Sequence, residues 1–149
     1  WFSLGAVLLE LDRYEQALAS FEKAYSHRFH FLENGHVIFP AAAVVLVMLG
    51  MSAIKKRWLP DLETATRAYI KWRERARRNK QLPAFRRGVQ GAQASLPEED
   101  REAYEEFHLS VRLLSIRDPF KGWKALSREV SKRWPKDVSA AQDIRKQRR

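Results

Sequence analysis

The sequence contains no cysteine, and this absence removes several classes of function. Disulfide bonds, thiol catalysis and cysteine-based zinc sites are all excluded. A chain without cysteine suits a reducing compartment, so we expect an intracellular, cytoplasmic protein. The sequence also lacks a glycine-rich phosphate loop, a nucleophile elbow and a Ser/His/Asp arrangement. We therefore predict that this chain is not an enzyme and needs no cofactor.

Glycine and proline are scarce, with six of each among 149 residues. They fall between long stretches in which apolar side chains recur at helical spacing. Hydrophobic residues make up 45% of the chain and include five tryptophans, which is enough for a packed core. We therefore predict an all-α protein in which glycine and proline mark the joints between helices.

The first 34 residues carry a spaced pattern of small and large side chains. Gly5, Ala17 and Ala24 are small where two helices would cross, and Trp1 and Phe21 can fill the space around them. This pattern resembles the tetratricopeptide repeat (TPR), a 34-residue unit of two antiparallel helices. The matching positions are Trp1, Leu4, Gly5, Leu8, Tyr14, Ala17, Phe21 and Ala24, with leucine at position 8 where an aromatic residue is usual.

The resemblance implies a protein-interaction scaffold that holds a peptide or helix of another protein in a concave groove. The first helix of each repeat lines that groove, which here means Ser3, Ala6, Val7 and Glu10, with the exposed side of residues 44–51. These side chains are mostly small or apolar, so the resemblance does not imply a carboxylate clamp. TPR units stack in series, and position 1 already carries a signature residue, so we expect the C-terminal part of a longer protein.

Helices are expected over residues 1–11 and 14–31, followed by a stop at Asn34 and Gly35, which both tolerate a positive φ. Residues 37–54 then contain no charged side chain and lead directly into a basic cluster at 55–57. The segment can be the first helix of a degenerate second TPR over residues 35–80, because Leu46, Leu49 and Gly50 repeat the spacing of the first unit. The alternative is that it crosses a membrane, because a mean hydropathy of roughly 2.5 and a helical length of about 27 Å suit a bilayer.

Residues 81–149 are predicted to form a basic helical C-terminal region. A short helix is expected over residues 84–94, and another after Ser95, where serine would act as N-cap and Glu98 would complete a capping box. Tyr104 and Phe107 lie on the inward face of that second helix. A further helix should begin at Pro119.

Negative charge is under-represented, since 28 lysines and arginines oppose 18 acidic residues and give a net charge of +10. This excess favours an anionic partner: an acidic protein, an anionic membrane surface or, less strongly, nucleic acid. The residues expected to form an electrostatic docking surface lie on one helix: Arg67, Lys71, Arg73, Arg75, Arg77, Arg78 and Lys80. A solvated helix face is the alternative, because Tyr69 and Trp72 among them share an apolar stripe.

Three histidines, His27, His30 and His36, fall within ten residues of one another. A metal site needs three or four convergent ligands, and no His-Glu-x-x-His pattern accompanies these histidines. We therefore predict no metal site and place the histidines at the surface or at helix ends.

Overall fold

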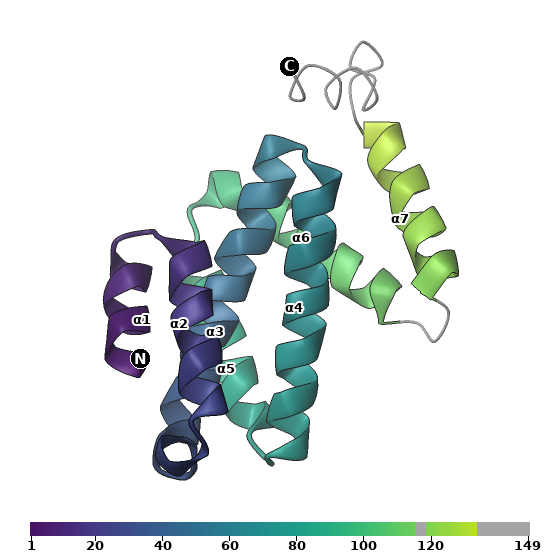
Figure 1. Cartoon of the computed structure of the whole chain (residues 1–149). Helices are drawn as coiled ribbons and strands as arrows, with labels where there is room; N and C mark the ends of the chain where they lie inside the picture. Colours follow the sequence, from purple (N-terminus) through teal and green to yellow (C-terminus); the bar gives the residue numbers. More distant parts are fainter. Residues whose placement is uncertain (116–118, 134–149) are drawn as a thin grey trace, which may run out of the picture. The chain divides into compact units, whose positions relative to one another are not determined.

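The computed structural model describes residues 1–115 and 119–133, with the exception of the side chains of 28–35, 119–123, 130 and 133. Its α-helices are α1 (Phe2–Glu10), α2 (Tyr14–Ser26), α3 (Arg28–Lys56), α4 (Leu59–Arg78), α5 (Leu82–Ala94), α6 (Arg101–Leu114) and α7 (Pro119–Arg133) (Figure 1). A 3-10 turn, Glu98–Asp100, precedes α6. No strand occurs in the described residues, which confirms the predicted all-α class.

The chain divides into two compact units, residues 1–112 and residues 113–149. The first unit contains α1 to α5 and nearly all of α6. The second unit contains α7, which begins at Pro119 as the sequence predicts.

The long helix α3 is the centre of the first unit. It packs against α2, α4 and α5, which surround it in Figure 1. The side chains of Phe39, Val45, Leu46 and Val47 are fully buried. Each such side chain contributes about 1.5–3 kcal/mol of hydrophobic stabilisation. A helix that is apolar on all sides thus serves here as the core around which the others are arranged.

Two glycines allow neighbouring helices to approach α3 closely. A Cβ added at Gly88 of α5 would lie 2.6 Å from the Cα of Pro40 and would also meet the Pro40 carbonyl oxygen. A Cβ added at Gly50 of α3 would overlap the ring of Phe107 on α6. Both contacts require glycine, because any side chain at these positions would push α5 or α6 away from α3.

The α1–α2 hairpin has part of the packing that the spaced pattern predicts. Trp1 is 52% exposed, so the expectation that it fills the space at the crossing is wrong, and Ala24 is only half-buried. The side chains of Ala17 and Phe21 are fully buried. A Cβ added at Gly5 would lie 2.6 Å from the Phe21 ring, so α1 approaches α2 at the expected point. Asp12 closes the turn between the helices with a φ of 56° and accepts a hydrogen bond of 2.8 Å from the Tyr14 hydroxyl.

The predicted helix stop at Asn34 and Gly35 is wrong. α2 ends earlier, at Ser26, and the non-helical residue is His27, with φ −87° and ψ 78°. α3 begins at Arg28 and continues through both predicted breakers and through Pro40. Asparagine and glycine lower helix stability by less than about 1 kcal/mol each, which the burial of a long apolar helix outweighs.

The predicted N-cap at Ser95 is also wrong. Ser95 ends α5 instead, and its hydroxyl donates a hydrogen bond of 2.9 Å to the Gly91 carbonyl one turn back. The next helix starts later, after Pro97 and the acidic 3-10 turn. A serine hydroxyl can satisfy either end of a helix, so its position in the sequence does not by itself settle which end it caps.

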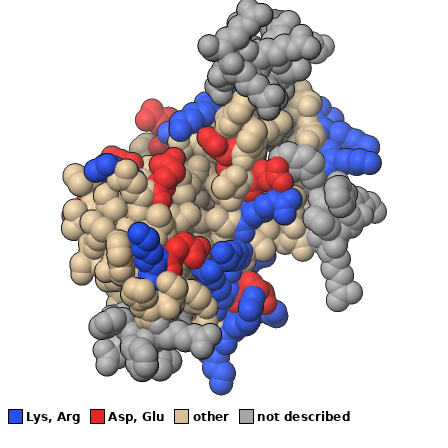
Figure 2. Space-filling model, viewed as in Figure 1, with Lys and Arg blue, Asp and Glu red and all other residues tan. Residues whose placement is uncertain are grey.

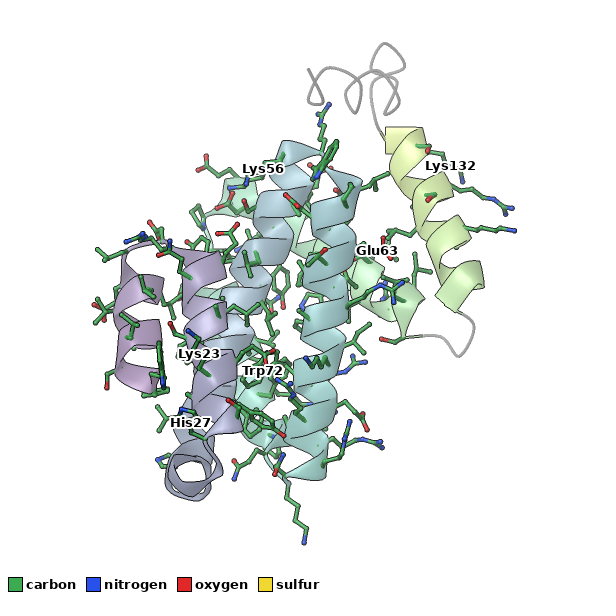
Figure 3. The ribbon with its side chains drawn as sticks, viewed as in Figure 1. Lys23, His27, Lys56, Glu63, Trp72 and Lys132 are labelled. Carbon is green, nitrogen blue, oxygen red and sulfur yellow. The ribbon has the colours of Figure 1, made fainter. Side chains whose placement is uncertain are left out.

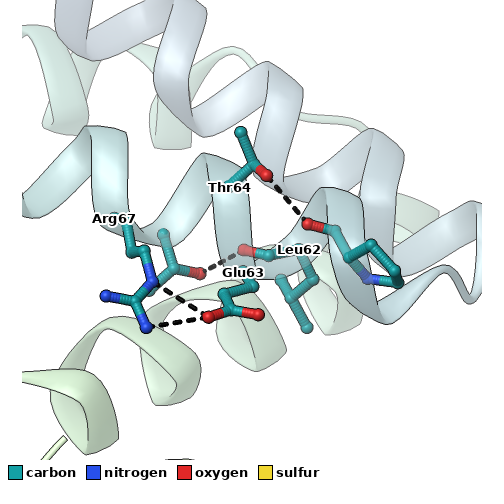
Figure 4. Close-up of polar contacts among 6 residues, drawn as sticks. Leu62, Glu63, Thr64 and Arg67 are labelled. Carbon is teal, nitrogen blue, oxygen red and sulfur yellow. Dashed lines mark hydrogen bonds and ion pairs between the residues drawn. The ribbon is translucent and has the colours of Figure 1, made fainter.

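Side-chain hydrogen bonds support the first half of α4 (Figure 4). The Thr64 hydroxyl donates to the Pro60 carbonyl, and the Arg67 guanidinium donates twice to the Glu63 carboxylate. The buried Thr66 hydroxyl lies 2.9 Å from the Ser110 hydroxyl of α6. The last pair joins α4 and α6 through the core and satisfies both buried hydroxyl groups.

Candidate functional site

Exposed apolar side chains are concentrated on α1. Trp1, Leu4, Val7 and Leu11 are 52%, 47%, 53% and 60% exposed, and they belong to α1 or flank it directly. Among the described residues, Val37 is the other large hydrophobic side chain that is exposed. We call Leu4, Val7 and Leu11 the α1 stripe. Their spacing of three and then four residues places them on one side of the helix.

The predicted groove residues occupy α1 beside this stripe. Ser3, Val7 and Glu10 are exposed, and Ala6 is half-buried. Val7 belongs to both sets, while Ser3, Ala6 and Glu10 form a more polar neighbouring face. The sequence analysis thus pointed to the helix on which exposed apolar side chains gather, but it left Leu4 and Leu11 out of the predicted groove.

The predicted basic surface on α4 is not uniform. The Arg75 side chain is only 15% exposed, and its guanidinium lies 2.7 Å from a carboxylate oxygen of Glu22 on α2. The indole nitrogen of Trp72 donates a 3.0 Å hydrogen bond to the same carboxylate. Trp72 points from α4 into the space between α4 and α2 (Figure 3). Arg75 also covers the ring of Tyr25, with its guanidinium carbon 4.4 Å from the ring centroid. Arg75 thus joins two helices and is not a free docking group.

Several of the other predicted basic residues are partnered by acidic neighbours. Arg67 pairs with Glu63, and both Arg77 and Arg78 reach Glu74. Lys71 lies 3.9 Å from the Glu22 carboxylate. Acidic side chains lie among the basic ones on the face in Figure 2. The remaining two, Arg73 and Lys80, are half-buried and exposed respectively.

The described structure contains one segment that could cross a membrane by length and composition, His36–Lys56 within α3. An 18-residue window within it has a mean hydropathy of 2.5, and 56% of that window is buried inside the protein. This length and composition suit both alternatives from the sequence analysis, a buried helix of a second TPR-like unit and a helix that crosses a membrane. The packing of α2, α4 and α5 around the segment is what a core helix would have.

Two hollows lie between helices of the first unit. One has a volume of about 170 Å³, lies between α2, α3 and α4, and has Leu18, Leu49 and Ala65 in its walls. The other has a volume of about 390 Å³ and lies between α5 and α6, with a more polar lining that includes Gln90, Gln93 and Tyr104.

The structure also brings together aromatic and ionisable residues that sequence reasoning did not connect. The rings of Tyr104 and His108 on α6 lie 4.4 Å apart, and Tyr69 of α4 lies 6.2 Å from His108. The spacing of four residues between Tyr104 and His108 was visible in the sequence, but the approach of Tyr69 was not. Among the described residues, no group of three His, Cys, Asp or Glu side chains converges on a metal position.

The fold and this arrangement define the class of protein: an all-α protein whose first unit packs helices around α3 and leaves apolar side chains exposed on α1. Comparison with protein-family models, with curated proteins and with solved structures found no match to the chain.

Proposed function

We propose that the protein is a protein-interaction scaffold of TPR-like helical hairpins, without catalytic activity in this chain, and that the α1 stripe binds a helix of another protein. The observation that carries this proposal is the concentration of exposed apolar side chains on one helix. Exposed apolar patches on otherwise well-packed proteins mark interaction surfaces.

The spacing of the α1 stripe indicates what kind of partner fits it. Leu4, Val7 and Leu11 follow one another at intervals of three and four residues, which is the spacing of a seam between two packed helices. α1 itself carries a single charged residue, Glu10, so the seam has little electrostatic selectivity. The partner that suits this face is an amphipathic helix that presents its apolar side.

The hairpin packing supports the TPR-like part of the proposal. Gly5 meets Phe21 at the crossing of α1 and α2, and Ala17 is buried beside it, as the family pattern implies. In a TPR array, the first helix of each unit carries the binding face, and on this proposal α1 is that helix.

The packing of α3 supports the soluble alternative over a membrane anchor. Val45, Leu46 and Val47 are fully buried by protein, so a bilayer would have to replace helices that already cover them. Ion pairs on α4 likewise favour a structural role for much of the basic surface over a nucleic-acid interface, because paired guanidinium groups are less available to phosphates.

The proposal is tested by selecting helical peptides from a display library against the whole chain and measuring their affinity by fluorescence anisotropy. We expect the selected peptides to carry apolar residues at helical spacing. Leu4→Glu should weaken their binding by about 30-fold or more, because it removes about 2 kcal/mol of leucine burial and opposes a carboxylate to an apolar surface.

Ser3→Glu provides the matched control, because it adds the same charge at the adjacent exposed position, outside the α1 stripe. We expect its effect on affinity to be less than about threefold. Equal binding by wild type and Leu4→Glu would contradict the proposal. A larger effect of Ser3→Glu than of Leu4→Glu would move the binding face to Ser3, Ala6 and Glu10.

A further inference from the structure

The hollow between α2, α3 and α4 has an apolar floor. Leu18 of α2 and Leu49 of α3 form its larger walls, and both are half-buried. Alanine occupies the positions at which a longer side chain would fill the space, namely Ala53 of α3 and Ala65 and Ala68 of α4. The hollow thus exists because small residues lie beside leucines where three helices meet. We call it the α2–α4 hollow.

Three charged side chains also line the α2–α4 hollow. Glu15 lies in the first turn of α2, Lys56 is the last residue of α3, and Asp61 lies in the first turn of α4. These helix ends lie toward the top of the view in Figure 1, and Lys56 is labelled there in Figure 3. The hollow therefore combines an apolar floor with charges of both signs.

None of these three charged side chains forms an ion pair with another side chain in the part of the chain that the structure describes. The neighbouring Lys55, by contrast, pairs with Asp100. Glu15, Lys56 and Asp61 are all exposed. Their charged groups are therefore available to a ligand that occupies the hollow.

The volume of the hollow limits the size of the group that can enter it. This volume is about 170 Å³. In other proteins an apolar cavity of about 150 Å³ accepts a benzene ring, whereas drug-sized ligands occupy pockets of roughly 300–1,000 Å³. The α2–α4 hollow therefore suits a single aromatic or branched aliphatic group and not a larger molecule.

We propose that the α2–α4 hollow binds a free α-amino acid with a large apolar side chain, such as phenylalanine or leucine. The apolar side chain fills the hollow, the α-carboxylate lies toward Lys56, and the α-ammonium lies toward Glu15 and Asp61. Such a zwitterion complements all three charges of the hollow. A side chain within a peptide does not, because its amine and carboxyl groups are bound in neutral amides. No residue of α1 lines the hollow, so this site does not depend on the α1 stripe.

The test is an NMR titration of the whole chain with L-phenylalanine. The methyl groups of Leu18 and Leu49 are local reporters, because an aromatic ring that packs against them shifts their resonances. Three further probes share the phenyl ring: phenethylamine lacks the carboxylate, 3-phenylpropanoate lacks the ammonium, and N-acetyl-phenylalanine amide lacks both charges. We expect saturable binding of L-phenylalanine with a Kd below about 1 mM. Each probe with one charge should bind about fivefold more weakly, and the neutral probe more than about tenfold more weakly.

Substitutions in the hollow assign the binding to it. Lys56→Gln should weaken L-phenylalanine binding by about fivefold but should not weaken phenethylamine binding, because that probe has no carboxylate. Arg57→Gln is the matched control, since it removes the same charge from the next residue, which does not line the hollow. Its effect should be less than about twofold. Ala68→Leu should fill the hollow and abolish binding, while circular dichroism checks that the helices remain.

Three outcomes would overturn the proposal. The first is no saturation with L-phenylalanine up to about 10 mM, a concentration at which even weak sites fill. The second is equal affinity for L-phenylalanine and N-acetyl-phenylalanine amide, which would make the hollow a seat for a side chain of a partner peptide. The third is undiminished binding to Ala68→Leu, or an equal loss of affinity in Lys56→Gln and Arg57→Gln, which would place the ligand elsewhere.

Discussion

Replacing Gly88 by alanine should destabilise the protein by about 3 kcal/mol, although alanine is the better helix former. The new Cβ would lie 2.6 Å from the Cα of Pro40 and against the Pro40 carbonyl oxygen. Both atoms belong to the backbone of the central helix, which cannot move aside as a flexible side chain would. α5 must therefore shift away from α3, and apolar contacts between the two helices are lost. Urea unfolding followed by far-ultraviolet circular dichroism measures the free energy of unfolding.

Gly91→Ala is the matched control in the same helix. A Cβ added at Gly91 meets no atom within 4 Å, so the substitution should raise the free energy of unfolding by about 0.5–1 kcal/mol through helix propensity alone. The two alanine variants should thus change stability in opposite directions. If Gly88→Ala were as stable as Gly91→Ala, the close packing of α5 on α3 would be incorrect.

Replacing Trp72 by alanine should reduce the free energy of unfolding by about 3–5 kcal/mol. The Trp72 side chain is fully buried. The centroid of its ring lies 5.6 Å from that of Tyr25 and 6.0 Å from that of Phe39. The substitution would leave a large cavity between α2, α3 and α4. It would also remove the indole donor to Glu22, whose carboxylate would keep Arg75 and Lys71 as partners.

Two further variants separate the parts of this effect. Trp72→Phe keeps an aromatic ring and removes the hydrogen bond to Glu22, so it should cost less than the alanine variant. Trp1→Ala makes the same change at a side chain that is 52% exposed and should cost about 1 kcal/mol or less. Comparable losses at positions 1 and 72 in thermal or urea unfolding would refute the central place of Trp72.

The helix content of the chain could be predicted from the sequence because its apolar residues recur at helical spacing. α1 and α7 begin close to the expected residues. The joint before α3 could not be predicted, because Asn34 and Gly35 are common helix breakers. The structure instead breaks at His27, which has no distinctive local preference. The position of the break depends on how much of α3 the surrounding helices bury. This burial is a tertiary effect that the local sequence does not encode.

The candidate sites were predictable to different degrees. The exposed edge of α1 follows from a local pattern within eleven residues. The role of Arg75 does not, because its partner Glu22 is 53 residues away on another helix. The same holds for the approach of Tyr69 on α4 to His108 on α6. A single sequence contains no pattern that joins residues across such separations.

The measurement that tests the central claim most directly is the distribution of the full chain between soluble and membrane fractions, with and without Val45→Lys. The Val45 side chain is fully buried in α3. If α3 is the core helix of a soluble scaffold, wild type should stay in solution without detergent and should not float with liposomes. Val45→Lys should then unfold or aggregate, because it places an unpaired charge in the core. A wild-type chain that requires detergent, and whose segment 36–56 is shielded from protease in vesicles, would contradict the account.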